Sequence, residues 1–367
     1  MNKLKVIQLL PELNIGGVER GTKDFSKALS DLGHQSIVIS NGGIFEEDII
    51  KDGGKHINLP IHKKSLFSFF LSKQLKNIYL KENPDIVHVR SRMPAWINHY
   101  AFKKLAKKPL LISTFHGLYS TPMYSQIMSK VDHIIAISDT VKNYIIDTYK
   151  VAEDKITTIP RGCDLEVFNQ DAIQPEWINK WYEEFPETKN KIILTLPTRI
   201  SKWKGVDSFI ELISRLDKNK FHGLVVGPTS KSKKRYLNTL QSKILDLNIK
   251  KNITFTGSRS DITNIYKISD VVFNLSISPE PFGRTTIEAI SCGTKVIGWN
   301  HGGTKEILEK LYPVGLVKLG NLQDLSDKVE RISDKNYPMP SENIYTSERM
   351  INKTLNLYNQ LCHSRSH

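Results

Sequence analysis

Short apolar runs alternate with amphipathic stretches along almost the whole chain, and this alternation predicts strands separated by helices. The first apolar run, at 5–10, is followed by a polar loop and by a stretch at 18–32 whose apolar residues recur on one helical face. The next run, at 35–40, predicts a second strand. A strand, a helix and a strand in this order form a crossover between parallel strands, so we expect parallel sheets covered by helices.

The remaining runs continue this pattern in two series. Strands are expected at 85–89, 110–114, 133–137 and 155–159 in the first half, and at 191–196, 223–227, 253–257, 271–277 and 295–299 in the second. A polar stretch at 169–190, rich in Glu, Pro and Trp, separates the two series and is typical of a linker. Because 367 residues are too many for one ordinary core, we predict two doubly wound domains, 1–172 and 173–346.

Composition narrows the classes of function. The hydrophobic content of 39% and charged content of 25% are typical of a soluble globular protein, and no apolar run reaches the roughly 18 to 20 residues that span a bilayer. The first apolar run is too short for a signal peptide, so a cytoplasmic protein is expected. Three cysteines without metal-ligand spacing are expected to be reduced and packed. The net charge of +14 predicts an anionic partner, which is nucleic acid, an acidic membrane surface or a phosphorylated substrate.

The stretch 279–288 has the most informative chemistry. A strand run ends just before it and a short helical pattern follows, so a strand passes into a helix N-terminus at Gly283 and Arg284. Unpaired N–H groups and the helix dipole favour an anion at such a junction, and glycine permits its close approach. Glu280 and Glu288 flank the junction, and their carboxylates suit hydroxyl groups such as those of a sugar and a ribose. The alternative is two solvated acids around an ordinary turn.

A second strand-to-helix junction, at 197–205, combines the same geometry with fixed cations. Arg199 can donate two parallel hydrogen bonds to phosphate oxygens, and Lys204 supplies a point charge. The alternative is a solvated basic loop. The loop after the first strand contains Gly16 and Gly17, which permit a ligand to approach a helix start, but the G-x-G-x-x-G pattern of a dinucleotide site is missing.

Two further features have two interpretations each. His116 follows the strand expected at 110–114, where sheets of this class place reactive side chains, but a lone histidine is more commonly structural. The stretch 62–81 combines large apolar residues with five lysines. It is expected either to lie on an anionic membrane surface or to bury its apolar face on the sheet as a crossover helix.

Together these motifs resemble the family-four retaining glycosyltransferases of the GT-B fold. The resemblance depends on Glu280 and Glu288 in an E-x7-E arrangement with Pro-Phe-Gly after the first Glu, on Phe-His-Gly around His116, on the glycine loop and on Arg199 with Lys204. The chain departs from the family at Thr198, where Gly is common, and at Arg161 and Cys163, which replace the commoner Asn and Val.

The resemblance implies a fold and an activity. Two Rossmann-like domains, the first completed by a C-terminal helix at about 347–367, would face a cleft and transfer a sugar from a nucleotide-diphosphate donor to an acceptor hydroxyl with retention at the anomeric carbon. The resemblance also implies a role in the synthesis of cell-envelope glycans, lipopolysaccharide or glycolipids. Lipid-linked acceptors would place the protein at the inner face of the cytoplasmic membrane.

The resemblance also implies roles for individual residues. His116 and Glu280 are expected at the reacting sugar, Arg199 and Lys204 at the pyrophosphate, and Glu288 at the ribose. The remaining donor-binding residues implied in this way are Gly16, Gly17, Arg259 near the base, Phe282, Gly283, Arg284 and Thr285.

No metal or other cofactor is expected. Glycosyltransferases of the other main fold hold a metal with an Asp-x-Asp element that this chain lacks, so Arg199, Lys204 and the helix start at Gly283 would take the charge of the leaving phosphate. One alternative is a nucleotide-sugar epimerase of the same fold, which needs no acceptor. Another is a basic nucleic-acid-binding protein, but no motif of that class is present. The expected partners are therefore a nucleotide sugar, a glycan or lipid-linked acceptor and an anionic membrane, and not nucleic acid.

Overall fold

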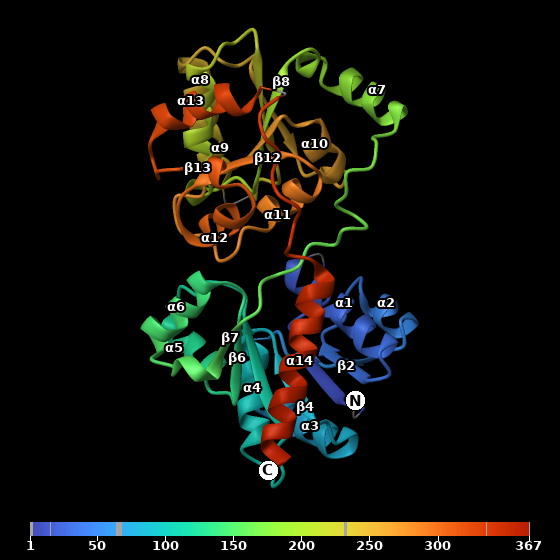
Figure 1. Ribbon diagram of the computed structural model, residues 1–367. Coiled ribbons are helices and arrows are strands. Elements are labelled where there is room, and N and C mark those ends of the chain that lie inside the picture. Colours follow the sequence, from blue (N-terminus) through green and yellow to red (C-terminus); the bar gives the residue numbers. More distant parts are fainter. Residues whose placement is uncertain (1–2, 15, 64–67, 231–232, 335, 367) are drawn as a thin grey trace. The chain divides into compact units, whose positions relative to one another are not determined.

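The computed structural model describes residues 3–14, 16–63, 68–230, 233–334 and 336–366. The chain forms two compact units, the first made of Met1–Pro160 with Glu348–His367 and the second of Arg161–Ser347. Each unit is a parallel sheet flanked by helices (Figure 1). The expected α/β class is confirmed.

The first sheet has seven strands in the order β3-β2-β1-β4-β5-β6-β7. The strands are β1 (Lys5–Leu9), β2 (Gln35–Ser40), β3 (Lys55–Asn58), β4 (Ile86–Val89), β5 (Leu110–Phe115), β6 (His133–Ala136) and β7 (Ile156–Thr158). In this sheet, only β3 was not expected from the sequence. It is an edge strand of four residues with a single apolar side chain, Ile57, so it lacks the apolar run by which the other strands were recognised.

Helices cover the first sheet. They are α1 (Gly17–Asp31), α2 (Glu46–Lys51), α3 (Ser68–Glu82), α4 (Arg92–Phe102), α5 (Pro122–Ser125), α6 (Asp139–Tyr149) and α14 (Ser347–Ser366). Phe25 of α1 and Tyr358 of α14 pack edge to face, with ring centres 5.7 Å apart, in one core with side chains of β1, β4 and β5. The last helix, red in Figure 1, is thus part of the first unit.

The second sheet has six strands in the order β10-β9-β8-β11-β12-β13. The strands are β8 (Ile192–Pro197), β9 (Phe221–Val226), β10 (Ile253–Gly257), β11 (Val271–Asn274), β12 (Lys295–Trp299) and β13 (Leu316–Val317). The main helices are α7 (Pro175–Glu184), α8 (Val206–Arg215), α9 (Lys234–Asp246), α10 (Ile262–Ile268), α11 (Arg284–Ser291), α12 (Gly302–Leu311) and α13 (Leu322–Ile332).

The expected linker at 169–190 is wrong in part, because α7 occupies its middle. Trp181 is buried, and Trp177 and Phe185 pack beside it on a core formed by β8, β9 and α10. The second unit also begins earlier than the expected residue 173. Its start is held at Cys163, whose N–H donates to the Tyr345 carbonyl at 2.8 Å.

Within the basic stretch at 62–81, residues 68–81 belong to α3, and 64–67 lie outside the described residues. Leu75 and Tyr79 are buried, as a crossover helix requires. Phe70 and Leu80 are 68% and 63% exposed on the outer side of the helix, where Lys73 is exposed as well. Both interpretations of this stretch therefore keep some support. Within the described part of the chain, no helix has the length and apolar character needed to cross a bilayer.

Within the described part of the chain no disulfide links the three cysteines, and Cys163 and Cys292 are buried. Burial raises the pKa of each of these two thiols to about 12. They are therefore protonated at neutral pH, as expected of packing residues.

Each sheet reverses its strand order once, between β1 and β4 in the first unit and between β8 and β11 in the second. In doubly wound sheets the helices diverge at such a point and leave a crevice at the carboxyl ends of the two strands, where ligands bind. Ligand sites are therefore expected at these two reversal points.

Candidate active site

A pocket of about 200 Å³ lies at the reversal point of the second sheet, beyond the carboxyl ends of β8 and β11. It is lined by residues 196–199, Lys204, 273–276, Glu280 and Thr285. Gly205, with φ of +76°, brings the loop after β8 against the loop after β11. A Cβ at this position would lie 1.8 Å from the carbonyl oxygen of Leu275, so only glycine permits this packing.

An ion pair between Lys204 and Glu280 forms part of the pocket wall. The Lys204 Nζ lies 2.5 Å from Oε1 of Glu280, and the Ser276 hydroxyl donates to the same oxygen at 2.5 Å. Glu280 is only 8% exposed, which strengthens both interactions. The second carboxylate oxygen, Oε2, receives no hydrogen bond from a described residue. It is therefore available to accept one from a ligand hydroxyl.

Arg199 supplies a second cation to the same pocket. It follows β8 by two residues, is exposed, and forms no ion pair within the described ranges. Lys204 is held differently, because its Nζ also lies 4.1 Å from the centre of the Trp203 ring. One cation is thus fixed by a carboxylate and an aromatic ring, and the other is free to meet an anion.

The loop 279–288 is held by close contacts between backbones. Gly283, with φ of +106°, precedes the first residue of α11, and Thr285 in the first turn lines the pocket. The N–H of Gly303 donates to the Glu280 carbonyl at 2.8 Å, and a Cβ on Gly303 would lie 2.3 Å from the Phe282 carbonyl oxygen. Phe282 itself is buried and packs edge to face on Tyr345, so its role is to anchor the loop.

Glu288 lies in α11 but does not line this pocket. Its Oε1 accepts from Arg284 at 2.9 Å, and its Oε2 accepts from the Tyr266 hydroxyl at 3.2 Å. Burial, together with the Glu288 charge, raises the pKa of Tyr266 well above its ordinary value, so the phenol stays a donor. The structure therefore brings Glu280, Arg199, Lys204 and Thr285 together, and holds Arg284 and Glu288 in a separate pair.

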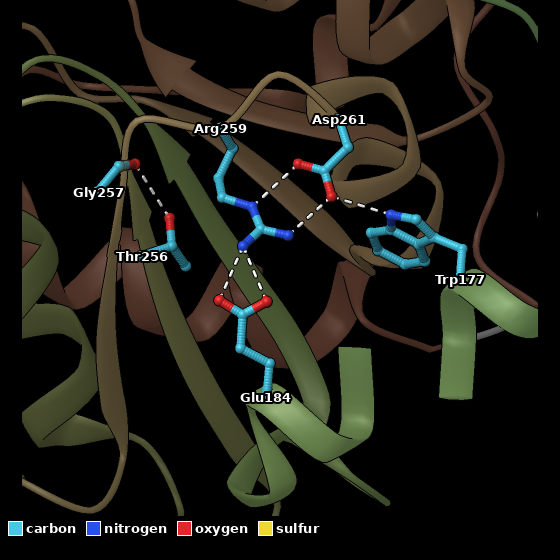
Figure 2. Close-up of polar contacts among 6 residues, drawn as sticks. All are labelled: Trp177, Glu184, Thr256, Gly257, Arg259 and Asp261. Carbon is cyan, nitrogen blue, oxygen red and sulfur yellow. Dashed lines mark hydrogen bonds and ion pairs between the residues drawn. The ribbon is translucent and has the colours of Figure 1, made fainter. Parts of the chain in front are cut away.

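Arg259 has a different environment from the one expected, as Figure 2 shows. Its Nη1 donates to both carboxylate oxygens of Glu184 at 2.9 Å, while Nε and Nη2 donate to the two oxygens of Asp261 at 2.9 and 2.8 Å. Trp177 donates to Asp261 as well, at 2.9 Å. These bonds raise the pKa of Arg259 and tie α7 to the loop after β10. The structure gives Arg259 a structural role and no support as a contact to the base.

Three of the expected residues belong to the first unit. Gly16 precedes α1, and Gly17 is its first residue, at the carboxyl end of β1. His116 directly follows β5, and its backbone N–H donates to the Tyr119 hydroxyl at 3.4 Å. All three lie at the carboxyl edge of the first sheet, as expected.

Sequence reasoning missed several residues that shape the pocket. Ser276 orients Glu280, and the ring Nε2 of His301 donates to the Ser276 carbonyl at 2.7 Å. Asn274 lines the pocket at the end of β11. The signal was their position at or just past the end of a strand, which is where the expected sites also lie. In the described part of the chain, no group of three or more His, Cys, Asp or Glu side chains is placed to hold a metal ion.

Comparisons with known proteins cover both units. Residues 15–167 match the family described as Glycosyltransferase Family 4, and residues 178–353 match Glycosyl transferases group 1. The crystal structure of a glycosyltransferase from Rickettsia africae ESF-5 is 31% identical, with a TM-score of 0.83. The match covers 98% of this chain and 99% of that one.

Two other similar proteins are more distant. The structure of HepE from Anabaena in complex with UDP and glucose is 19% identical, with a TM-score of 0.75 and 99% of each chain covered, and shows similarity of fold alone. The N-acetyl-alpha-D-glucosaminyl L-malate synthase of Bacillus anthracis is 24% identical over 347 residues, which are 89% of this chain and 86% of that protein.

Proposed function

Because the chain belongs to the family-4 glycosyltransferases, which have the two-domain GT-B fold, we propose that it transfers a sugar from a nucleotide-diphosphate donor to an acceptor hydroxyl, with retention at the anomeric carbon. The observation that carries the donor part is the second-unit pocket, where Arg199 and Lys204 meet Glu280. Cations suit the donor phosphates and a carboxylate suits sugar hydroxyls. HepE, which has the same fold, binds UDP and glucose.

The protein itself stabilises the negative charge that develops on the departing diphosphate. The Arg199 guanidinium is exposed on the pocket wall and forks two hydrogen bonds to phosphate oxygens. Lys204 and the N–H groups at the start of α11 add positive charge, the latter equivalent to roughly half an elementary charge. Preorganised donors of this kind stabilise the transition state electrostatically, so the reaction proceeds without a divalent metal.

Glu280 orients the sugar. Its Oε1 is held by Lys204 and Ser276, so Oε2 has a fixed direction and accepts a hydrogen bond from a sugar hydroxyl. A fixed hydroxyl sets the position of the reacting carbon relative to the acceptor. A contact to the reacting sugar is proposed for His116 as well, which follows β5 at the carboxyl edge of the first sheet.

Glu288 takes the ribose hydroxyls by sharing oxygens that Arg284 and Tyr266 already orient, since each carboxylate oxygen has two acceptor positions. Replacing Glu288 with Gln should weaken binding of the product nucleotide about tenfold, the scale of one charge-assisted hydrogen bond. The control is Glu309→Gln, which removes an exposed acid of α12 paired with Lys305. Equal nucleotide affinity in the two variants would contradict the ribose assignment.

The donor is identified by a thermal-shift screen of nucleotide sugars, because a ligand that binds only the folded state raises Tm. We expect one nucleotide class to raise Tm in the wild type and in Arg235→Gln, which alters an exposed arginine of α9. The shift should be lost in Arg199→Gln. No shift with any nucleotide sugar would contradict the proposed donor.

A lipid-linked acceptor, in cell-envelope glycan or lipopolysaccharide synthesis at the inner face of the cytoplasmic membrane, is supported by the outer side of α3. Phe70 and Leu80 are exposed there beside Lys73 and Lys81. Lysines near an anionic surface contribute about 1 kcal/mol each at low salt. Charge reversal at Lys73 and Lys76 should therefore weaken sedimentation with anionic vesicles, whereas reversal at Lys250 and Lys251 of the second unit should not. Wild-type protein that stays in the supernatant at low salt would rule out this surface as a membrane contact.

A further inference from the structure

Arg90 lies at the reversal point of the first sheet. It directly follows β4, and its backbone N–H donates to the Leu9 carbonyl at the end of β1, at 2.9 Å. Its side chain turns into the unit, where Nε donates to Oε1 of Gln8 at 2.9 Å and the guanidinium carbon lies 5.6 Å from the centre of the Phe25 ring. Only 7% of the residue is exposed. A guanidinium is thus buried where doubly wound sheets bind ligands.

Within the described part of the chain, this guanidinium has no counter-charge. Among the described residues no carboxylate pairs with Arg90, and its two terminal nitrogens, Nη1 and Nη2, have no hydrogen-bond partner. The polar neighbours are neutral. His88 exchanges hydrogen bonds with the Tyr358 hydroxyl at 2.6 Å and the Thr114 hydroxyl at 2.7 Å, and burial lowers the pKa of His88 well below its ordinary value. Burial lowers the pKa of Arg90 to about 10, so Arg90 keeps its charge at neutral pH.

An unpaired buried charge is costly, and a residue that serves packing alone is better replaced by an apolar side chain. The surroundings add to the positive potential rather than offset it. Helix α4 begins two residues after Arg90, and the side chain of Ser91, which precedes α4, does not cap that helix. An anion placed here would meet the guanidinium fork beside the start of α4.

We propose that Arg90 binds an oxyanion, a carboxylate or a phosphate, carried by the acceptor substrate. The negative charge of this group supplies the counter-charge that the described residues do not provide, and Nη1 and Nη2 match two of its oxygens. The term acceptor rests on the proposed function, whereas the anion site itself does not.

The test uses inorganic phosphate and acetate as probes in an Arg199→Gln background, which removes the exposed arginine of the second-unit pocket. We expect at least one probe to raise Tm by about 2 °C or more at saturation. The shift should disappear in Arg90→Met and persist in Arg365→Met, which alters an arginine of α14 whose side chain is 47% exposed. A response to phosphate alone identifies a phosphorylated acceptor, and a response to acetate alone a carboxylated one.

A structural role for Arg90 predicts a different result. It would make Arg90→Met less stable than the parent without any anion, whereas a ligand site leaves the variant equally or more stable. If Arg90→Met does not fold, the Nε–H resonance of Arg90 in the parent protein provides a second measurement, and it should move on titration with the effective probe. An unmoved resonance, no Tm shift with either probe, or a full shift in Arg90→Met would overturn the proposal. Nucleotide binding to Arg90→Met, measured separately, reports on the donor site.

Discussion

The two sheets of this chain reverse their strand order at equivalent places, but the polar groups at these places differ. In the second unit, Lys204 is paired with Glu280, and Arg199 is exposed beside them. In the first unit, Arg90 is buried and no carboxylate among the described residues faces it. The same topology thus presents a mixed acidic and basic pocket in one unit and a purely cationic position in the other.

This difference indicates two kinds of ligand. A nucleotide sugar has phosphates and hydroxyls, so a pocket that binds it needs cations and a carboxylate together. A site with a cation alone has no acceptor for hydroxyls and selects a group that carries negative charge. Topology decides where a ligand binds, and the side chains just past the strands decide which ligand it is.

The largest effect is expected from Glu280→Gln. Loss of the charged acceptor should lower turnover about a thousandfold, because the sugar hydroxyl is no longer held by a charge-assisted bond at the reacting centre. The matched control is Glu211→Gln, since Glu211 also pairs with a lysine at 2.5 Å but lies on α8. Steady-state kinetics with the identified donor measures both. Near-normal turnover in Glu280→Gln would show that the pocket with Glu280 and Lys204 is not the site of the reaction.

Arg199→Ala should lower turnover about a hundredfold, the scale of one lost preorganised donor, and added magnesium should not restore it. Lys204→Ala should lower turnover similarly and also destabilise the fold, because it leaves the carboxylate of Glu280 buried without its cation. Arg235→Ala is the control for a lost surface charge. Assay of the wild type in excess chelator completes the test, since activity that is abolished and then recovered with manganese would contradict metal independence.

The cores of the two units each contain a buried neutral histidine, His88 in β4 and His222 in β9. Burial lowers the pKa of His222 to about 4, below the ordinary value of 6.5, so the folded state binds this proton less readily than the unfolded state. The contribution of the neutral His222 ring to the free energy of unfolding is therefore fully present above pH 6.5 and is lost as pH falls towards 4. Between pH 7 and 4.5 the unfolding free energy of the wild type falls in part because His222 must take up a proton. The unfolding free energy of His222→Gln should therefore fall by about 2 kcal/mol less over the same range.

Urea unfolding at several pH values measures this loss. The control is His363→Gln, which changes an exposed histidine of α14 and should leave the pH dependence unaltered. An equal slope in wild type and His222→Gln would contradict the assignment of a neutral buried ring.

The smallest effect is expected from Arg259→Met. The Glu184 partner is 52% exposed, so solvent screens this network, and its loss should lower the unfolding free energy by only about 1–2 kcal/mol. Nucleotide affinity should stay within about twofold of wild type, because Arg259 is occupied by Glu184 and Asp261. Calorimetric titration measures this affinity, and a tenfold loss of nucleotide affinity in Arg259→Met would indicate that Arg259 contacts the donor.

Most of the fold could be predicted because its signals are local. Buried parallel strands read as continuous apolar runs, so β1, β8 and the other central strands were found. The edge strand β3 was missed because it has one apolar residue, and β13 was missed because it has only two residues. Helix α7 was missed although Trp177 and Trp181 share one helical face, because the polar residues around them are typical of a linker. Their places depend on neighbours that are remote in the sequence.

The sequence by itself determined two parallel α/β units, the strand-to-helix junctions at Arg199 and Gly283, and the residue types that suit phosphates and hydroxyls. These features follow from apolar periodicity and from residues a few positions apart, which the chain displays directly. Tertiary structure alone decided that Lys204 meets Glu280, that Arg259 is occupied by Glu184 and Asp261, and that Arg90 is buried with no carboxylate beside it among the residues that the structure describes. The physical reason is that the charge state and availability of a polar group depend on burial and on partners that are remote in the sequence, such as Gln8, 82 residues from Arg90. Only packing brings such partners together.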